Sequence, residues 1–416
     1  MNEHVARVAR GKLARKSSVP AVGSMERLPT WLTRVPMALQ WAWLSLRCRS
    51  LTLPSVANPR IIAGGLVGDT KSEHFASMGA HARSRVAPFT LLRVAGVDQL
   101  AAAMSAMRDA ELRFPVVAKP DLGCCGFGVR RLDDALELAD YLARYPLGES
   151  LMLQRYLDEP GEAELFYARH PEQAQGQLLR ILLRHYPQVV GDGVSTVAQL
   201  IGADRRLARA HRRRREHIVH YNPHRIPAKG EAVRLSLIGS IRVGGRCEDA
   251  STLATSELLA TVEAVAGDMP QFHVGRFDVR YSNLQELRAG RFTIMQVNGA
   301  GSGAEQAWDP GYSLRQVYRI VFARQRMLFA LGAYHRARGH RPIGMLALAR
   351  HHLRRQRLMR RYPPSNRAGP ASAPREHVHA RLASTPGERL AMPAKRAPRL
   401  SGGDHGRVEG LSIVMG

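Results

Sequence analysis

Residues 117–129, VAKPDLGCCGFGV, place Lys119 at the end of a short apolar strand and directly before a glycine-rich turn. The glycines of this turn are Gly123, Gly126 and Gly128. Triphosphate binding uses a fixed positive charge together with glycines that let backbone N–H groups approach the phosphate oxygens. The stretch is neither a Walker loop nor a clean dinucleotide fingerprint, because no Gly-Lys-Ser/Thr ends it and Lys-Pro precedes the turn. It indicates a phosphate-binding loop, with an ordinary strand–turn–helix connection as the alternative.

On both sides of this loop the sequence alternates between apolar strands and helices. The expected strands are residues 88–94, 114–120, 151–157, 163–169, 178–186, 233–243, 273–281 and 291–298. The expected helices are 97–112, 132–145, 196–201, 314–335 and 342–361. A short helix capped by Asp69 or Thr70 is also expected, running through His74 to Met78. Residues 51–62 are expected to form a loop and then a strand. Such alternation with short connections is typical of a layered α/β or α+β domain.

Two of the expected strands carry polar side chains at alternating positions. GRFDVR holds Arg276 and Asp278 on one strand face, and IMQVNG holds Gln296 and Asn298 in the same way. If these strands are neighbours that face a cleft, Asp278, Gln296 and Asn298 form a set of oxygen ligands of the kind Mg²⁺ prefers. Arg276 would then stabilise phosphoryl charge. A hairpin whose polar side chains face solvent is the alternative.

A third stretch, LMLQRYL at residues 151–157, is expected to be a buried strand that ends at an adenine edge, with Glu162 close behind. In this order and spacing the three stretches resemble the ATP-grasp superfamily, most closely the D-alanine–D-alanine ligases and similar carboxylate–amine ligases. The resemblance covers residues 60–309, and VVGDGVST and NGAGSGAEQAWDP add to it. It implies an α+β ATP-grasp fold in which two lobes clamp ATP, with a smaller N-terminal α/β subdomain and basic, partly disordered ends.

The resemblance also implies a role for each candidate residue. Lys119 and Arg276 would be catalytic, and Asp278, Gln296 and Asn298 would hold Mg²⁺. The ATP-binding residues would be Lys71, Lys119, the loop glycines Gly123, Gly126 and Gly128, the adenine hinge Gln154, Arg155, Tyr156 and Leu157, Glu162 at the ribose and Arg184 at a phosphate. The implied reaction uses ATP and Mg²⁺ to convert a small carboxylate into an acyl phosphate, which an amine then attacks.

One position departs from the family pattern, since Gln296 stands where family members usually carry Glu. An amide has no negative charge and cannot bridge two Mg²⁺ ions as a carboxylate does, so metal binding is expected to weaken. Glu305, nine residues on, is a candidate to compensate. Two alternatives stay open: a catalytically degenerate ATP-binding or scaffold protein, and a carboxylase or thiol ligase on the same fold.

The length of the chain and the distribution of its charge indicate how it is divided into domains. Its 416 residues, 45% of them hydrophobic, suffice for two or three domains. We expect a disordered basic arm at 1–28, an N-terminal subdomain at 29–88, the ATP-grasp domain at 89–313, basic helices at 314–361 and a disordered tail at 362–416. The net charge of +26 divides into +7 for residues 1–50, +13 for residues 331–416 and +6 between them. The balanced centre argues against specific nucleic-acid binding.

The remaining sequence features concern location. Four cysteines without a CxxC pair favour a reducing cytoplasm over a disulfide framework or zinc site. Residues 35–46 are rich in Trp and Leu between arginines, and residues 342–361 join leucines to clustered arginines. Both compositions suit peripheral contact with an anionic membrane surface, and a helix packed on the core is the alternative. The arginine run at 205–215 is expected to be a solvated helix.

Overall fold

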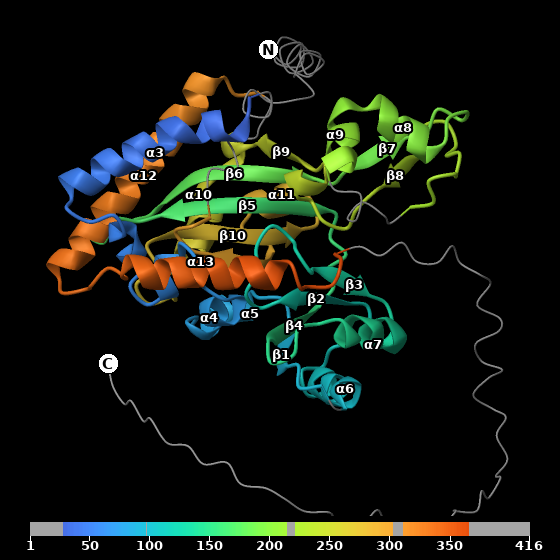
Figure 1. Ribbon diagram of the computed structural model, residues 1–416, viewed down its shortest axis with the longest axis horizontal. Coiled ribbons are helices and arrows are strands. Elements are labelled where there is room, and N and C mark those ends of the chain that lie inside the picture. The colour runs from blue at the N-terminus through green and yellow to red at the C-terminus, as the bar shows by residue number, and fades with distance from the viewer. Residues whose placement is uncertain (1–27, 97, 214–220, 303–310, 366–416) are drawn as a thin grey trace, which may run out of the picture. The chain divides into compact units, whose positions relative to one another are not determined.

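The computed structural model describes residues 28–96, 98–213, 221–302 and 311–365, all within one compact unit. Antiparallel strands form two sheets and one small ribbon, and helices cover them (Figure 1). The predicted α+β class is confirmed by this arrangement. The expected arm at 1–28 and tail at 362–416 lie outside the described residues, apart from Leu28 and residues 362–365.

The smaller sheet has the strand order β1-β4-β2-β3. Its strands are β1 (Phe89–Arg93), β2 (Val116–Pro120), β3 (Arg130–Leu132) and β4 (Ser150–Arg155). Helices α6 (Gln99–Asp109) and α7 (Ala135–Ala143) share one apolar core with these strands, in which Leu138 and Tyr141 are fully buried. Helix α7 begins where the Asp134 carboxylate accepts a hydrogen bond of 2.9 Å from the backbone N–H of Glu137. In this sheet strand β2, which carries Lys119, lies between β4 and β3.

The larger sheet has the order β11-β10-β5-β6-β9 and two chemically different faces. Its strands are β5 (Gly161–Ala168), β6 (Gln177–His185), β9 (Arg246–Asp249), β10 (Val274–Tyr281) and β11 (Thr293–Asn298). Helices α4 (Lys71–Ala76), α5 (Ala80–Ser84), α10 (Ser256–Gly267) and α11 (Leu284–Arg288) accompany it. One face packs on these helices in the main core, through side chains such as Leu165 and Phe277. The neighbouring residues on each strand, such as Glu164 and Asp278, point to the opposite face and are charged.

A separate small cluster forms around a two-stranded ribbon. Strands β7 (Gln188–Val190) and β8 (Ala232–Arg234) pack with helices α8 (Val197–Ala203) and α9 (Arg205–Arg213). The strand predicted at 233–243 is wrong over most of its length, because β8 ends at Arg234 and a short 3-10 helix, η4 (Ile241–Val243), closes the segment. The apolar residues Leu235, in irregular chain, and Val243, at the end of η4, are buried in this cluster.

The first described segment pairs with the long C-terminal helices. Helix α3 (Thr30–Arg47) packs on α12 (Leu314–Ala337), and α13 (Met345–Met359) follows (Figure 1). The strand predicted within 51–62 is wrong: these residues form the 3-10 helix η2 (Leu53–Val56), with a proline near its start, and lead to η3 (Ile62–Gly65). Residues 29–88 thus differ from the expected α/β subdomain, since they hold helices and one isolated bridge at Val86.

Candidate functional site

One cleft of about 860 Å³ brings together the predicted site residues from both sheets. It is lined by Lys71, Lys119, Gly123, Gly126, Gln154, Arg155, Tyr156, Leu157, Glu162, Arg184, Arg276, Asp278, Gln296 and Asn298. Gly128 is the predicted site residue that does not line it. Ten Lys and Arg residues line the cleft against four Asp and Glu residues, an imbalance that favours a polyanionic ligand.

Lys119 lies at the end of β2 and is 8% exposed. Its Nζ donates hydrogen bonds to Oε1 of Gln154 at 2.5 Å and to the carbonyl oxygen of Met295 at 3.4 Å. Burial, and after it the positive charge of Lys71, lower the pKa of Lys119 to about 7. A negatively charged ligand in the cleft would favour the protonated amine.

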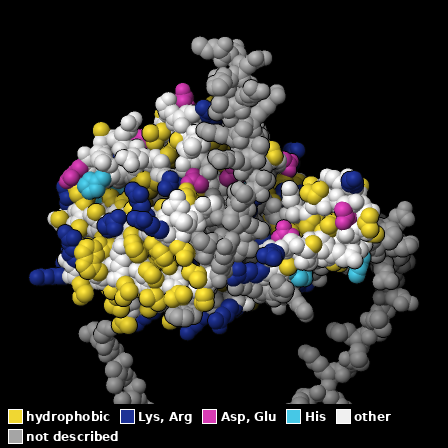
Figure 2. All heavy atoms as spheres, turned by 90° about the horizontal axis from the view of Figure 1, so that it is seen from above, with side chains coloured by type: hydrophobic (Ala, Val, Ile, Leu, Met, Phe, Trp, Pro, Cys, Tyr) yellow, Lys and Arg dark blue, Asp and Glu magenta, His cyan; other side chains and the backbone are white. Residues whose placement is uncertain are grey.

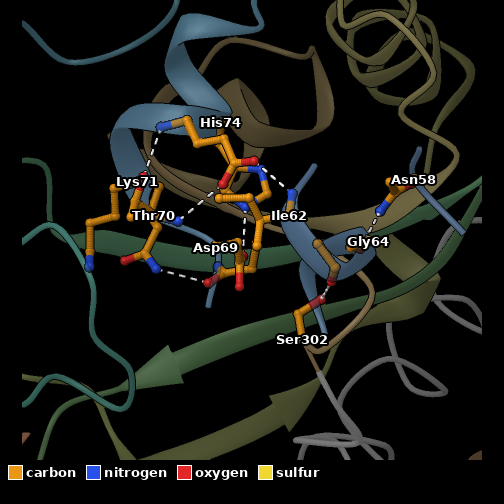
Figure 3. A network of polar contacts seen from close by, with 12 residues as sticks. Asn58, Ile62, Gly64, Asp69, Thr70, Lys71, His74 and Ser302 are labelled. Atoms are coloured by element: carbon orange, nitrogen blue, oxygen red, sulfur yellow. Dashed lines mark hydrogen bonds and ion pairs between the residues drawn. The ribbon is translucent and has the colours of Figure 1, made fainter. Parts of the chain in front are cut away.

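Lys71 is the first residue of α4, and its surroundings hold that helix against the end of β2. Thr70 and Glu73 form a capping box at the N-terminus of α4. Figure 3 shows Thr70 and Lys71 at this end of the helix. The Nζ atom of Lys71 donates to the carbonyl oxygens of Pro120 at 2.6 Å and Asp121 at 3.2 Å. Burial lowers the pKa of Lys71, while the nearby Asp121 carboxylate raises it. The predicted ATP lysine therefore also ties α4 to the start of the glycine-rich loop.

The glycine-rich loop, residues 121–128, is anchored from behind by the end of the described chain. The hydroxyl of Tyr362 donates to the carbonyl oxygen of Leu122 at 2.6 Å, and Oγ of Ser365 donates to that of Gly126 at 2.6 Å. A side chain at Gly128 would place its Cβ 2.7 Å from Cγ of Pro120, and its φ of +70° favours glycine. Gly128 is therefore required by loop packing, away from the cleft lining.

The predicted hinge lies where β4 leaves the smaller sheet. The side chain of Gln154 is buried, and both ends of its amide are hydrogen-bonded. The oxygen accepts from Nζ of Lys119, and Nε2 donates to the carbonyl oxygen of Ala87 at 3.2 Å. The guanidinium of Arg131 lies 4.4 Å from the ring centroid of Tyr156. Gln154 thus organises Lys119, while residues 155–157 line the cleft beyond it.

The two polar strands are neighbours, as the sequence predicts. Strands β10 and β11 are antiparallel, with Arg276 opposite Asn298 and Asp278 opposite Gln296. Nε of Arg276 donates to Oδ1 of Asp278 at 2.6 Å, and Nδ2 of Asn298 donates to Oδ2 of Asp278 at 3.0 Å. Nε2 of Gln296 donates to Oδ1 of Asn298 at 2.8 Å. The four side chains therefore form one connected group on the cleft face.

This group fits a single magnesium ion better than a pair. It offers one carboxylate, Asp278, and the amide oxygens of Gln296 and Asn298, which are hard ligands suited to Mg²⁺ together with phosphate oxygens. The described part of the chain holds no cluster of three His, Cys, Asp or Glu residues that could bind a metal without such help. Glu305, the predicted compensating carboxylate, lies outside the described residues.

The sequence analysis missed several polar residues at the cleft. Among them are Tyr186 and Arg280, which line it, and the buried Glu164, which contacts Arg184 and Arg276. The Glu164 carboxylate is almost fully buried. It accepts a hydrogen bond from Nε of Arg184 at 2.9 Å and forms an ion pair with Arg276, whose Nη1 lies 3.1 Å from Oε1. Arg280 donates from Nη2 to the hydroxyl of Tyr186 at 2.5 Å. Strand alternation could have found two of them, because Glu164 and Arg280 lie two positions beyond predicted site residues on the same strands.

Glu162, the predicted ribose ligand, sits in this same polar group. Its carboxylate accepts a hydrogen bond from the hydroxyl of Tyr186 and lies 3.5 Å from Nη2 of Arg280. Burial raises the pKa of Tyr186, so the phenol stays protonated and donates. Glu162 and Glu164 therefore hold the arginines of the larger sheet in fixed positions at the cleft.

The chain is similar to solved ligases, at low identity. The chain is similar to D-alanine–D-alanine ligase from Bacillus anthracis, with 14% identity and a TM-score of 0.33 over 63% of this chain and 68% of that one. It is also similar to a bifunctional glutathione synthetase from Pasteurella multocida, with 17% identity and a TM-score of 0.30. No family model matches the sequence, and no curated protein matches it.

The similarities cover only part of each chain. The chain covers 36% of the glutathione synthetase, with 61% of its own length matched. The matched structures are ligases of the kind that the sequence resembles.

Proposed function

We propose that this chain is an ATP-dependent ligase that activates a carboxylate and joins it to an amine. The observation that supports it most is the meeting of two groups in one cleft: Lys119 from the smaller sheet, and Arg276 with Asp278 from the larger one. A cationic cleft between two sheets suits a triphosphate, and the polar group at its floor suits the atoms that react.

In the proposed reaction a carboxylate oxygen attacks the γ-phosphorus of ATP, and the bond to ADP breaks. The acyl phosphate then reacts with an amine nitrogen at its carbonyl carbon, phosphate leaves, and the amine loses a proton. Such a reaction depends mainly on positioning and on neutralising phosphate charge. Mg²⁺, when bound, would supply part of that neutralisation.

The side chains divide this work in the proposed site. Lys119 binds the phosphates as an ammonium group, and backbone N–H groups of the glycine-rich loop approach them. Arg276 faces the γ-phosphate region beside Asp278, and the buried carboxylate of Glu164 keeps the guanidinium in place. Asp278, Gln296 and Asn298 would hold the magnesium ion.

The decisive experiment follows one oxygen atom. The purified full-length protein is screened with Mg-ATP against amino acids, amines and small carboxylates for ADP release. A carboxylate that stimulates release is then labelled with ¹⁸O. One label per turnover should appear in inorganic phosphate, because the attacking oxygen leaves with the phosphorus. Release of AMP, or label that stays wholly in the product, would contradict the acyl phosphate route.

A matched pair of variants ties the activity to the cleft. Lys119→Met should lower kcat/KM by about a hundred-fold or more, because the variant loses the positive charge that would contact the transferring phosphoryl group. Lys229→Met serves as the control, because Lys229 is exposed on the turn after Pro227 and does not line the cleft.

A second candidate is an ATP-binding protein without turnover, and Gln296 favours it. With one carboxylate among the three predicted ligands, and that carboxylate paired with Arg276, the site holds less negative charge than a two-metal site needs. Under this alternative Mg-ATP raises the thermal midpoint, and no carboxylate and amine pair stimulates ADP release.

A further inference from the structure

Helix α3 has a second apolar face that points away from the protein. Its inner face packs on α12, where the rings of Trp41 and Phe329 lie 5.0 Å apart and Leu44 is buried. Its outer face carries five exposed apolar side chains, which we call the α3 stripe: Leu32, Val35, Leu39, Trp43 and Leu46. At 100° per residue they fall within an arc of about 80°, along about 21 Å of helix.

Such a stripe is unusual for a surface helix. Leu39 is 67% exposed and Leu46 is 79% exposed, so neither contributes to the core. Single exposed apolar residues need no explanation, whereas a continuous row of five large ones marks a contact surface. The inner face already accounts for the packing of α3 on the protein, so the stripe is available to something else.

The charge around the stripe indicates what that partner is. Residues 27–68 contain no Asp or Glu, and neither do residues 310–375, so both α3 and α12 lack acidic side chains. Arg34, Arg47 and Arg49 are exposed on or beside α3. Figure 2 shows hydrophobic side chains gathered on one part of this face, with Lys and Arg side chains close by.

An apolar row on a helix pair, α3 and α12, that carries basic and no acidic side chains fits the interface of an anionic bilayer. Leucine side chains enter the acyl boundary, and arginines meet lipid phosphates at its edge. Trp43 suits the headgroup level, with the guanidinium of Arg47 5.6 Å from its ring centroid. Within the described residues no helix is long and apolar enough to cross a membrane, so the helix would lie in the surface.

A second copy of the chain fits this face less well. Pairing two such stripes would bring arginines against arginines, with no carboxylate from α3 or α12 to neutralise them. We therefore infer that the α3 stripe docks this protein on anionic lipid surfaces, with α3 lying in the interface. This inference stands apart from the ligase proposal, because neither α3 nor its stripe lines the cleft.

The test uses the full-length protein and sedimentation with vesicles of 30% phosphatidylglycerol and 70% phosphatidylcholine at low salt. The protein should sediment with these vesicles and remain in solution with pure phosphatidylcholine. Leu39→Ser with Leu46→Ser should weaken vesicle binding at least ten-fold. Leu136→Ser with Leu147→Ser is the matched control, since these leucines are 73% and 63% exposed on the smaller lobe, and it should bind as the wild type does.

Charge and fold are checked separately. Arg34→Glu with Arg47→Glu should also weaken vesicle binding about ten-fold or more, and high salt should weaken wild-type binding. Blue shift of tryptophan emission on adding vesicles to the wild type supplies a readout that needs no variant. Failure of the wild type to sediment, equal binding by the α3 variant and its control, or a lipid-free dimer abolished by the α3 substitutions would each overturn the inference.

Nucleotide binding separates this result from the ligase proposal. The α3 variants should keep the wild-type thermal shift with Mg-ATP, because the stripe lies outside the cleft. Loss of vesicle binding with ATP binding retained supports docking whatever the chemistry of the cleft is. A protein that binds vesicles and shows no ATP shift would contradict the ligase proposal and leave docking intact.

Discussion

Nζ of Lys119 donates a hydrogen bond of 2.5 Å to Oε1 of Gln154, so the predicted phosphate lysine and the first residue of the predicted hinge are joined directly. The amide of Gln154 is fixed in turn by its hydrogen bond to the carbonyl oxygen of Ala87. A buried amine whose pKa lies near neutrality is thus held at the end of β2, and it gains a proton more readily when negative charge arrives.

Nucleotide binding should therefore take up protons at alkaline pH. With the pKa of Lys119 at about 7, the amine is mostly neutral at pH 8.5, and bound phosphates raise that pKa again. Calorimetric titration with Mg-ATP in buffers of different ionisation enthalpy should report uptake approaching one proton at pH 8.5. Lys119→Met should remove this uptake and Lys229→Met should not. Equal uptake by Lys119→Met and wild type would show that another group gains the proton.

The same pKa shift predicts a pH dependence of stability. Lysine has a pKa of about 10.4 when unfolded, above its value in the folded chain, so the unfolded state binds more protons between about pH 7 and pH 10. Lys119 therefore makes the free energy of unfolding rise with pH through this window, and its full destabilising effect is present below pH 7. Urea denaturation without nucleotide should show a shallower rise for Lys119→Met. An unchanged slope would contradict the low pKa.

Gln296→Glu should tighten magnesium binding about five-fold or more. The new carboxylate would stand beside Asp278 across the strand pair and add a hard, charged ligand. Asp278→Asn should remove most Mg²⁺ dependence of nucleotide binding. The matched control is Gln285→Glu on the exposed face of α11, which should leave magnesium binding unchanged. If Gln296→Glu has no effect, the magnesium ion binds elsewhere in the cleft.

Strand alternation accounts for most of what the sequence predicted correctly in the site. The pairs at 276 and 278 and at 296 and 298 follow from it, and the same rule extended by one step reaches Glu164 and Arg280. The missed helix α10 also had a readable pattern, since Leu258, Val262 and Val265 lie on one helix face behind the Thr255 cap.

Other features depend on contacts between distant residues. The hydrogen bond from Tyr362 to Leu122 joins positions 240 residues apart, and no local pattern predicts it. The expected tail at 362–416 therefore begins too early, because residues 362–365 are packed against the glycine-rich loop. The apolar run after β8 resembles a strand in sequence. Leu235 and Val243 are nevertheless buried in a small apolar cluster without strand pairing.

Glu164→Gln should destabilise the protein by about 3 kcal/mol. The substitution removes the buried carboxylate that serves both Arg184 and Arg276, which leaves two guanidinium groups without their shared negative charge. Urea denaturation measures the change in the free energy of unfolding. Glu172→Gln is the control, since this side chain is 65% exposed and its loss should change stability by about 0.5 kcal/mol or less. Equal small effects of both variants would contradict the role of Glu164 as the anchor of the two arginines.

Tyr362→Phe should loosen the glycine-rich loop while leaving the chemistry of the cleft in place. The variant keeps the stacking on Tyr145, whose ring centroid lies 5.5 Å away, and loses the hydrogen bond to Leu122. The expected loss of stability is about 1 kcal/mol. The affinity for Mg-ATP should fall a few-fold, because the loop that covers the phosphates is less well positioned. Hydrogen exchange of residues 121–128 should rise in Tyr362→Phe and stay at the wild-type level in Tyr334→Phe, a half-buried tyrosine of α12. A loop that exchanges at the wild-type rate in Tyr362→Phe would mean that Ser365 and the packing of α13 hold it without the tyrosine hydroxyl.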